Sequence, residues 1–145
     1  MPITITPARS ACDLQHLHTL FNLVFELKPD TVASQGTFES LFKKNDACFL
    51  LALQRETIVG GLAAYELPLL SGEKEFYIYD IGVHPEYQKQ GIGTSLIQEL
   101  KKQARSRNIA TIFVESESAD VGAVAFYKSL EAEQIKVEHF NIQVD

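Results

Sequence analysis

The sequence predicts one mixed α/β domain over residues 1–145, of the α+β kind, with a mostly antiparallel sheet. Three apolar strands joined by short turns, over residues 48–83, predict an antiparallel meander. An amphipathic helix then links the third strand to a further apolar strand, which favours a parallel pair with a right-handed crossover. The element order β-α-α-β-β-β-α-β-α-β therefore predicts one sheet flanked by helices.

The first half of the chain contains four expected elements. Alternating Ile and Thr predict a strand over residues 3–6. Leu and Phe at three- and four-residue intervals predict a helix over residues 11–27, and a similar spacing predicts a shorter helix over residues 37–43 with Thr37 as its N-cap. A continuous apolar run over residues 48–53 is typical of a central strand.

The second half continues the sheet and adds two helices. Gln54-Arg55-Glu56 predicts a hairpin turn, and Gly60-Gly61 marks a bulge or a close backbone approach within the strand that follows. Apolar and aromatic patterns predict the remaining strands over residues 57–67, 75–83, 110–114 and 135–144. Apolar residues at helical spacing predict the remaining helices over residues 93–107 and 120–130.

The composition is that of an ordinary globular protein, with 46% hydrophobic and 22% charged residues. Lys and Arg number 13 and Asp and Glu number 19, so the formal net charge is −6. This balance argues against nucleic acid as a partner, because binding to phosphates requires clustered cations. It suits a cationic small substrate, although the same acidity also serves solubility.

Several other classes of site and location are not expected. The two cysteines lie far apart, and the four histidines show no ligand pair with a nearby carboxylate, so we predict no metal site. The N-terminal residues lack the apolar core of a signal peptide, and no apolar run reaches the length of a membrane span. We therefore expect a cytoplasmic protein that does not associate with membranes.

The strongest local signal lies in residues 75–94. His84-Pro85 ends the strand, a short polar loop follows, and Gly91-Ile92-Gly93-Thr94 opens the next helix. The first N–H groups of a helix lack partners within it and carry partial positive charge, and glycines let a phosphate approach the backbone. We interpret residues 88–94 as a cradle for a diphosphate; the alternative is an ordinary strand-to-helix turn.

The spacing Gln88-x-x-Gly91-x-Gly93 resembles the (Arg/Gln)-x-x-Gly-x-(Gly/Ala) signature of the GCN5-related N-acetyltransferase (GNAT) superfamily, and the element order is also similar. The resemblance implies a mixed sheet of six or seven strands with about four helices, and a parallel strand pair splayed around acetyl-coenzyme A. It implies that the cofactor is bound by Ile81, Gly82, Val83, Gln88, Lys89, Gln90, Gly91, Ile92, Gly93 and Thr94.

The same resemblance suggests catalytic residues. Residues 125–130 are similar to the second motif of the superfamily, which makes Tyr127 the general acid for the leaving thiolate; the alternative is a packing role for its ring. The superfamily usually has a glycine where Glu131 stands. Asp80 lies mid-strand among apolar residues, where an unpaired carboxylate is costly, and is our candidate base. Three other acids near the expected cleft are candidates both as alternative bases and as substrate-binding groups: Glu115, Glu117 and Asp120. Glu75 is a further alternative base.

Residues 60–68, 77–81 and 139–140 resemble the aminoglycoside 3-N-acetyltransferases of the superfamily, and residues 114–127 fit them without a gap. The chain departs from them at Val121, where they carry a further acid, and at Glu131. The resemblance implies transfer of acetyl from acetyl-coenzyme A to an amine of an aminoglycoside. Two alternatives stay open: a peptide, a polyamine or another amine as the acceptor, or a non-catalytic module that binds coenzyme A. A homodimer is also compatible with the sequence.

Overall fold

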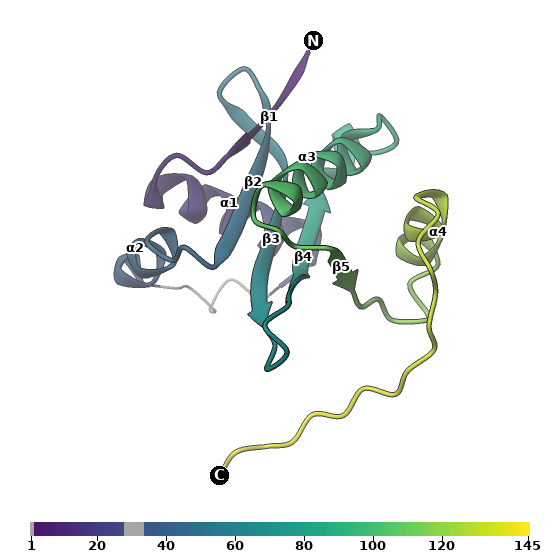
Figure 1. The fold of residues 1–145 in the computed structure, drawn as a ribbon. Coiled ribbons are helices and arrows are strands. Elements are labelled where there is room, and N and C mark those ends of the chain that lie inside the picture. Colours follow the sequence, from purple (N-terminus) through teal and green to yellow (C-terminus); the bar gives the residue numbers. More distant parts are fainter. Residues whose placement is uncertain (1, 28–33) are drawn as a thin grey trace. The chain divides into compact units, whose positions relative to one another are not determined.

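The computed structural model describes residues 2–27 and 34–145, which divide into two compact units, up to Glu115 and from Ser116. Within the described part of the first unit, five strands form one sheet in the order β1-β2-β3-β4-β5 (Figure 1). The strands are β1 (Ile3–Pro7), β2 (Ala47–Gln54), β3 (Thr57–Pro68), β4 (Lys74–Val83) and β5 (Thr111–Val114). All neighbours are antiparallel except β4 and β5, which are parallel, so the predicted meander and parallel pair are confirmed.

Helices cover both faces of this sheet. The first unit contains α1 (Ala11–Val24), α2 (Gln35–Phe42), a single 3-10 turn η1 (Pro85–Tyr87) and α3 (Ile92–Ser106). Leu17, Leu20 and Phe21 of α1 share one core cluster with residues of β2 and β3. Leu96 and Leu100 of α3 are fully buried on the other face. Figure 1 shows α3 in front of the sheet and α1 behind it.

The glycine pair in β3 is explained by close approach on both faces. A Cβ on Gly61 would overlap Leu17 of α1, and a Cβ on Gly60 would lie 3.2 Å from the carbonyl oxygen of Gly82. The register of β2 against β3 also shifts between Ala52 and Leu53, and the shift lies just before the glycine pair in β3. Both predicted features, a bulge and a close approach, are therefore present here.

Two helix ends differ from the sequence prediction. Ser34, not Thr37, is the N-cap of α2, and its hydroxyl oxygen accepts the Thr37 N–H at 3.4 Å. The first helix ends at Val24, three residues before the predicted end. The residue at which a helix begins or ends depends on which polar groups cap its terminal turns. The spacing of apolar residues alone does not specify those groups.

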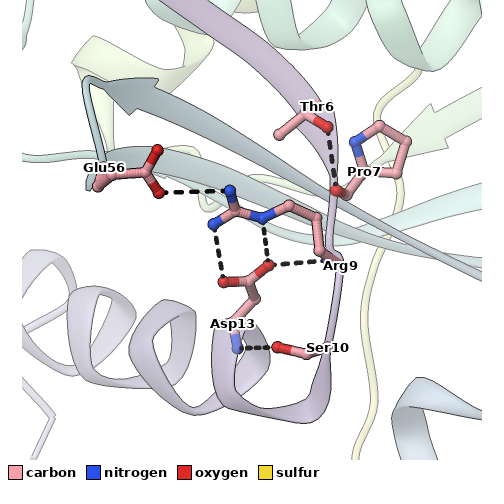
Figure 2. Close-up of polar contacts among 6 residues, drawn as sticks. All are labelled: Thr6, Pro7, Arg9, Ser10, Asp13 and Glu56. Atoms are coloured by element: carbon pink, nitrogen blue, oxygen red, sulfur yellow. Dashed lines mark hydrogen bonds and ion pairs between the residues drawn. The ribbon is translucent and has the colours of Figure 1, made fainter.

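A buried carboxylate fixes the start of α1 (Figure 2). Asp13 is only 7% exposed, and its two oxygens accept hydrogen bonds from the Arg9 guanidinium at 2.9 and 3.1 Å. The Arg9 backbone N–H also donates to Asp13, and Ser10 caps the helix by accepting the Asp13 N–H. These contacts join the end of β1 to α1, and the Arg9 side-chain hydrogen bond holds the pKa of Asp13 below its usual range.

We expect Arg9→Met to lower the free energy of unfolding at neutral pH. A depressed pKa gives stability that is present above the ordinary Asp pKa of about 3.9 and is lost as the pH falls through the folded-state pKa. The deficit of the variant should therefore shrink in acid, which chemical denaturation at several pH values will measure. Ser10→Ala is the matched control, because loss of the N-cap should cost about 1 kcal/mol without this pH dependence. An equal deficit at all pH values would show that Arg9 acts through packing alone.

The second unit consists of α4 (Val121–Ser129) and a C-terminal segment. Residues 132–145 form neither helix nor strand, so the predicted strand over residues 135–144 is not formed. The described sheet thus has five strands where we predict six or seven, although the mixed fold is confirmed and residues 2–27 and 34–145 contain four α-helices. Alternating apolar residues show which side of a strand would be buried, but a strand also needs a neighbour for its backbone hydrogen bonds.

Candidate active site

The predicted cradle lies at the N-terminus of α3. Gly91 is the N-cap of this helix in the left-handed conformation, with φ 82°, and the first turn has no side-chain cap. A Cβ built on Gly91 would meet no other atom within 4 Å, so the glycine borders open space. The N–H groups of the first helical turn have no partners within the helix and attract an anion. The strand, turn and helix start predicted for residues 75–94 are all present.

Side chains of the preceding turn hold its shape. The Gln88 side-chain amide donates to the carbonyl oxygen of Val83 at 3.0 Å, and the His84 Nδ1 atom accepts the Glu86 N–H at 3.1 Å. The Tyr87 hydroxyl donates to Gln54 on β2 at 2.8 Å. Gln88, a predicted cofactor-binding residue, therefore uses its side-chain amide to close the loop.

The pairing of the parallel strands β4 and β5 ends before β4 does. Its register ends at Ile78 and Val114, whereas β4 continues to Val83. The edge of β4 that faces β5 has no paired strand beyond Ile78 among the described residues, and this part of β4 contains the predicted cofactor-binding residues Ile81 and Val83. An extended ligand can pair with such an edge as an added strand does.

Gly82, a third predicted cofactor-binding residue on this part of β4, has a structural explanation of its own. A Cβ there would lie 3.1 Å from Val24 and 3.4 Å from Phe25, both at the end of α1. The close packing of α1 on β4 thus accounts for the glycine without a ligand.

A β-bulge positions Asp80. Ala63 of β3 pairs with Asp80 and Ala64 pairs with Ile78, so Tyr79 is an extra residue on β4. Asp80 therefore points to the same face as Ala63, which belongs to the core cluster under α1. Burial raises the pKa of Asp80, and the charge of His18 opposes this shift. A carboxylate with a raised pKa suits a general base.

The predicted acids do not share one environment. Glu115, at the end of the first unit, accepts a hydrogen bond from the Tyr77 hydroxyl at 2.9 Å. Glu117 and Asp120 belong to the second unit, and both are exposed. Asp120 is the N-cap of α4 and accepts the Ala123 N–H at 3.1 Å, so one of its oxygens is engaged in the helix start. Tyr77 is not among the site residues predicted from the sequence. The alternation of Tyr77 and Tyr79 along β4 was the signal that could have identified it.

Tyr127 lies on α4 within the second unit, half-buried, with its ring 5.2 Å from that of Phe126. Burial, and then the charge of Asp120, raise the pKa of Tyr127 to about 12. Its hydroxyl therefore stays protonated at physiological pH. A protonated hydroxyl is able to donate, as the predicted general acid requires.

The geometry of the first unit, an uncapped helix N-terminus and a β4 edge left unpaired beyond Ile78 among the described residues, agrees with the comparison to known sequences. The sequence model of the Acetyltransferase (GNAT) family matches residues 14–131. The chain belongs to the GNAT family. The predicted superfamily and its acyltransferase class are thereby confirmed at the level of the family.

Three related proteins illustrate the range of GNAT relatives. An aminoglycoside acetyltransferase from an uncultured soil metagenomic sample is 30% identical over 100% of both chains, with a TM-score of 0.93. A second soil enzyme of that kind, solved with sisomicin, is 28% identical, with a TM-score of 0.92 and coverage of 99% and 97%. The ribosomal protein bS18-alanine N-acetyltransferase of Escherichia coli strain K12 is 36% identical over 56 residues, which are 39% of this chain and 38% of that enzyme.

Two kinds of feature are absent from the described residues of this GNAT protein. Residues 2–27 and 34–145 contain no group of three or more His, Cys, Asp or Glu side chains arranged to hold a metal ion. In the same ranges, no helix combines the length and the apolar character that crossing a bilayer requires.

Proposed function

We propose that this GNAT protein transfers the acetyl group of acetyl-coenzyme A to a primary amine of an aminoglycoside, at the 3-amino group. The observation that carries the proposal is the position of Asp80, a carboxylate with a raised pKa that a bulge places where β4 and β5 separate. Full-length similarity to two aminoglycoside acetyltransferases supports the choice of acceptor.

The cofactor fits the residues present. The N–H groups at the start of α3, where Gly91 leaves open space, would hold the diphosphate of acetyl-coenzyme A. Lys89, also in the left-handed conformation at φ 62°, shapes the turn beside it. Backbone groups of Ile81 and Val83, on the part of β4 beyond its pairing with β5, would hold the pantetheine arm. The cofactor would supply the thioester, and Asp80 is the carboxylate on this part of β4.

Two residues of the chain handle protons in this scheme. Asp80, directly or through water, takes a proton from the acceptor ammonium, and the free amine attacks the thioester carbonyl. A carbon–nitrogen bond forms, the nitrogen releases its second proton to water, and the carbon–sulfur bond breaks, so the sulfur leaves as a thiolate. Tyr127 donates its proton to that thiolate, and both side chains return to their starting states by exchange with water.

The acidity of the chain supports a polycationic acceptor. An aminoglycoside carries several ammonium groups, and the net charge of −6 draws cations toward the protein. Glu115, Glu117 and Asp120 are the carboxylates assigned to the acceptor in this proposal. Their attraction is screened within about 8 Å at physiological salt, so kcat/KM for the amine should fall as ionic strength rises.

A peptide acceptor is the second candidate, favoured by one observation. The 36% identity over 56 residues relates part of this chain to an enzyme named for a ribosomal protein alanine. A peptide N-terminus offers a single ammonium group, so it uses fewer of the carboxylates. This reading therefore predicts a weaker dependence of kcat/KM on salt.

An assay of thiol release from acetyl-coenzyme A against a panel of amines tests the proposal. The panel contains aminoglycosides with and without a 3-amino group, a polyamine, and peptides that begin with Ala. We expect the highest kcat/KM with the 3-amino aminoglycosides, and NMR of the product will locate the acetyl group. Faster acetylation of the peptides would favour the second candidate. Coenzyme A binding without turnover of any amine would identify a non-catalytic module.

Tyr127→Phe should lower kcat by about 10- to 1,000-fold, because the substitution removes only the proton donor. The ring and its contact with Phe126 persist, so the affinity for acetyl-coenzyme A and the melting temperature should change little. Phe126→Tyr, which adds a hydroxyl to the neighbouring ring, is the matched control. Wild-type turnover in Tyr127→Phe would reduce Tyr127 to a packing role.

A further inference from the structure

Four aromatic side chains form a continuous row across three neighbouring strands. Tyr65 on β3 contacts Tyr79 on β4, with ring centroids 6.5 Å apart, and Tyr79 contacts Tyr77 at 5.8 Å. Tyr77 stacks on Phe113 of β5 at 4.8 Å, with the ring planes 13° apart. These residues, Tyr65, Tyr77, Tyr79 and Phe113, are called the aromatic platform. All of them belong to the first unit.

The platform lies on the sheet face that α1 partly covers. Tyr65 pairs directly with Tyr77 and lies two residues from Ala63, which is buried in the core cluster under α1. Helix α1 does not cover the platform itself, as the exposed fractions of Tyr79 (66%) and Phe113 (36%) show. Exposed aromatic rings that adjoin one another on a sheet face mark an interaction surface.

Carboxylates lie at two places along the platform. Asp80 follows Tyr79, and the bulge directs both side chains to the same face. Glu115 is held at the other side by the Tyr77 hydroxyl at 2.9 Å. Burial, and then this hydrogen bond, raise the pKa of Tyr77 to about 12, so the phenol stays neutral. The negative charge of the surface therefore comes from the carboxylates.

We propose that the aromatic platform holds a ring of the acceptor, an amino sugar whose ammonium groups lie against the tyrosine rings, Asp80 and Glu115. A saturated sugar ring presents C–H groups that pack on aromatic faces, and the negative faces of those rings attract ammonium groups. A flexible polyamine has the cations but no ring, and a peptide N-terminus has one cation. The inference rests on the proposed function, because it names the surface that selects the acceptor.

Tyrosine fluorescence offers a binding measurement that does not depend on turnover. The chain contains no Trp and five Tyr, and three of these belong to the platform. Titration with an aminoglycoside, without acetyl-coenzyme A, should change this emission, and a neutral disaccharide should bind far more weakly. Tyr79→Ala should raise both Kd and KM by about 3- to 30-fold with kcat little changed, which is the size of a cation–π contact. Tyr79→Phe keeps the ring and should stay within about twofold of the wild type.

Phe42→Ala is the matched control, since Phe42 is an aromatic residue on α2 that is 41% exposed. It should leave Kd and KM unchanged, and all three variants should melt at wild-type temperatures. If aminoglycosides are acetylated but Tyr79→Ala leaves Kd and KM unchanged, the platform is wrong and the proposed function stands. If the wild type binds an aminoglycoside through Tyr79 without acetylating it, the platform stands and the proposed function is wrong. Absence of both binding and turnover overturns both.

Discussion

Asp80→Asn is expected to lower kcat by about 100- to 10,000-fold, the usual size of general acid–base catalysis. The amide has nearly the same shape as the carboxylate but cannot accept a proton from the ammonium. Affinity for acetyl-coenzyme A should change little, because the proposed cofactor contacts are made by the cradle and by backbone groups of β4. Steady-state kinetics with the best amine of the panel, combined with calorimetry for the cofactor, will measure both quantities.

The pH dependence of Asp80→Asn provides a second measurement on the same variant. Burial raises the pKa of Asp80, so the acid limb of kcat should lie above the ordinary Asp range, and the variant should lose this limb. The same raised pKa predicts that Asp80→Asn increases the stability of the fold while it lowers kcat. A raised folded-state pKa means that the stability contributed by the protonated group is lost as the pH rises through that pKa.

We therefore expect Asp80→Asn to be more stable than the wild type at pH 7, and the difference to disappear below about pH 4, where Asp is protonated in both states. Thermal unfolding at the two pH values will show this. A variant with wild-type kcat would exclude Asp80 as the base and transfer that role to another acid, with Glu115 the nearest candidate along the platform. A loss of activity accompanied by lower stability would instead indicate a structural role.

Gly91→Val should weaken the binding of acetyl-coenzyme A at least about tenfold, because one hydrogen bond to a charged group is worth about 1.5–3 kcal/mol. The branched side chain enters the open space beside the first turn of α3, where we propose that the diphosphate binds. Calorimetry with acetyl-coenzyme A measures the loss directly. Gly93→Val tests the second glycine of the cradle in the same way.

Gly72→Val is a closely matched control for backbone strain. Gly72 lies in the turn between β3 and β4 with φ 89°, close to the 82° of Gly91, and a Cβ on either glycine would meet nothing within 4 Å. Both variants therefore have a non-glycine residue in the left-handed region, at a cost of about 1–2 kcal/mol. Equal melting temperatures with cofactor binding lost only in Gly91→Val would support the cradle. Equal affinities in the two variants would place the diphosphate elsewhere.

The cradle could be read from local sequence because local chemistry specifies it. His84-Pro85 ends a strand, and glycine at position 91 adopts a positive φ at the start of a helix whose apolar face is plain in the sequence. The hairpin at Arg55-Glu56 and the glycine pair in β3 are local in the same sense. These features depend on residues within one or two turns of one another, and the structure has the strand end, the turns and the helix start where they are predicted.

The arrangement of the aromatic platform and its carboxylates could not be predicted from local sequence. Strict alternation along β4 would place Tyr79 and Asp80 on opposite faces of the sheet, and only the bulge opposite Ala63 and Ala64 brings them together. The link between Tyr77 and Glu115 joins residues 38 positions apart, and the stack of Tyr77 on Phe113 needs the parallel register of β4 and β5. No pattern within one segment contains this information.

The C-terminal segment shows the same division between local and non-local information. The sequence alternates over residues 135–144, yet every residue there is exposed and the structure forms no strand. Helical hydrogen bonds close within one segment, so the periodicity of α3 was sufficient to predict it, whereas strand hydrogen bonds require a second segment at a matching register. Local sequence thus determined the helices, the turns and the cradle, while pairing between distant strands decided the strand count and the face on which Asp80 lies.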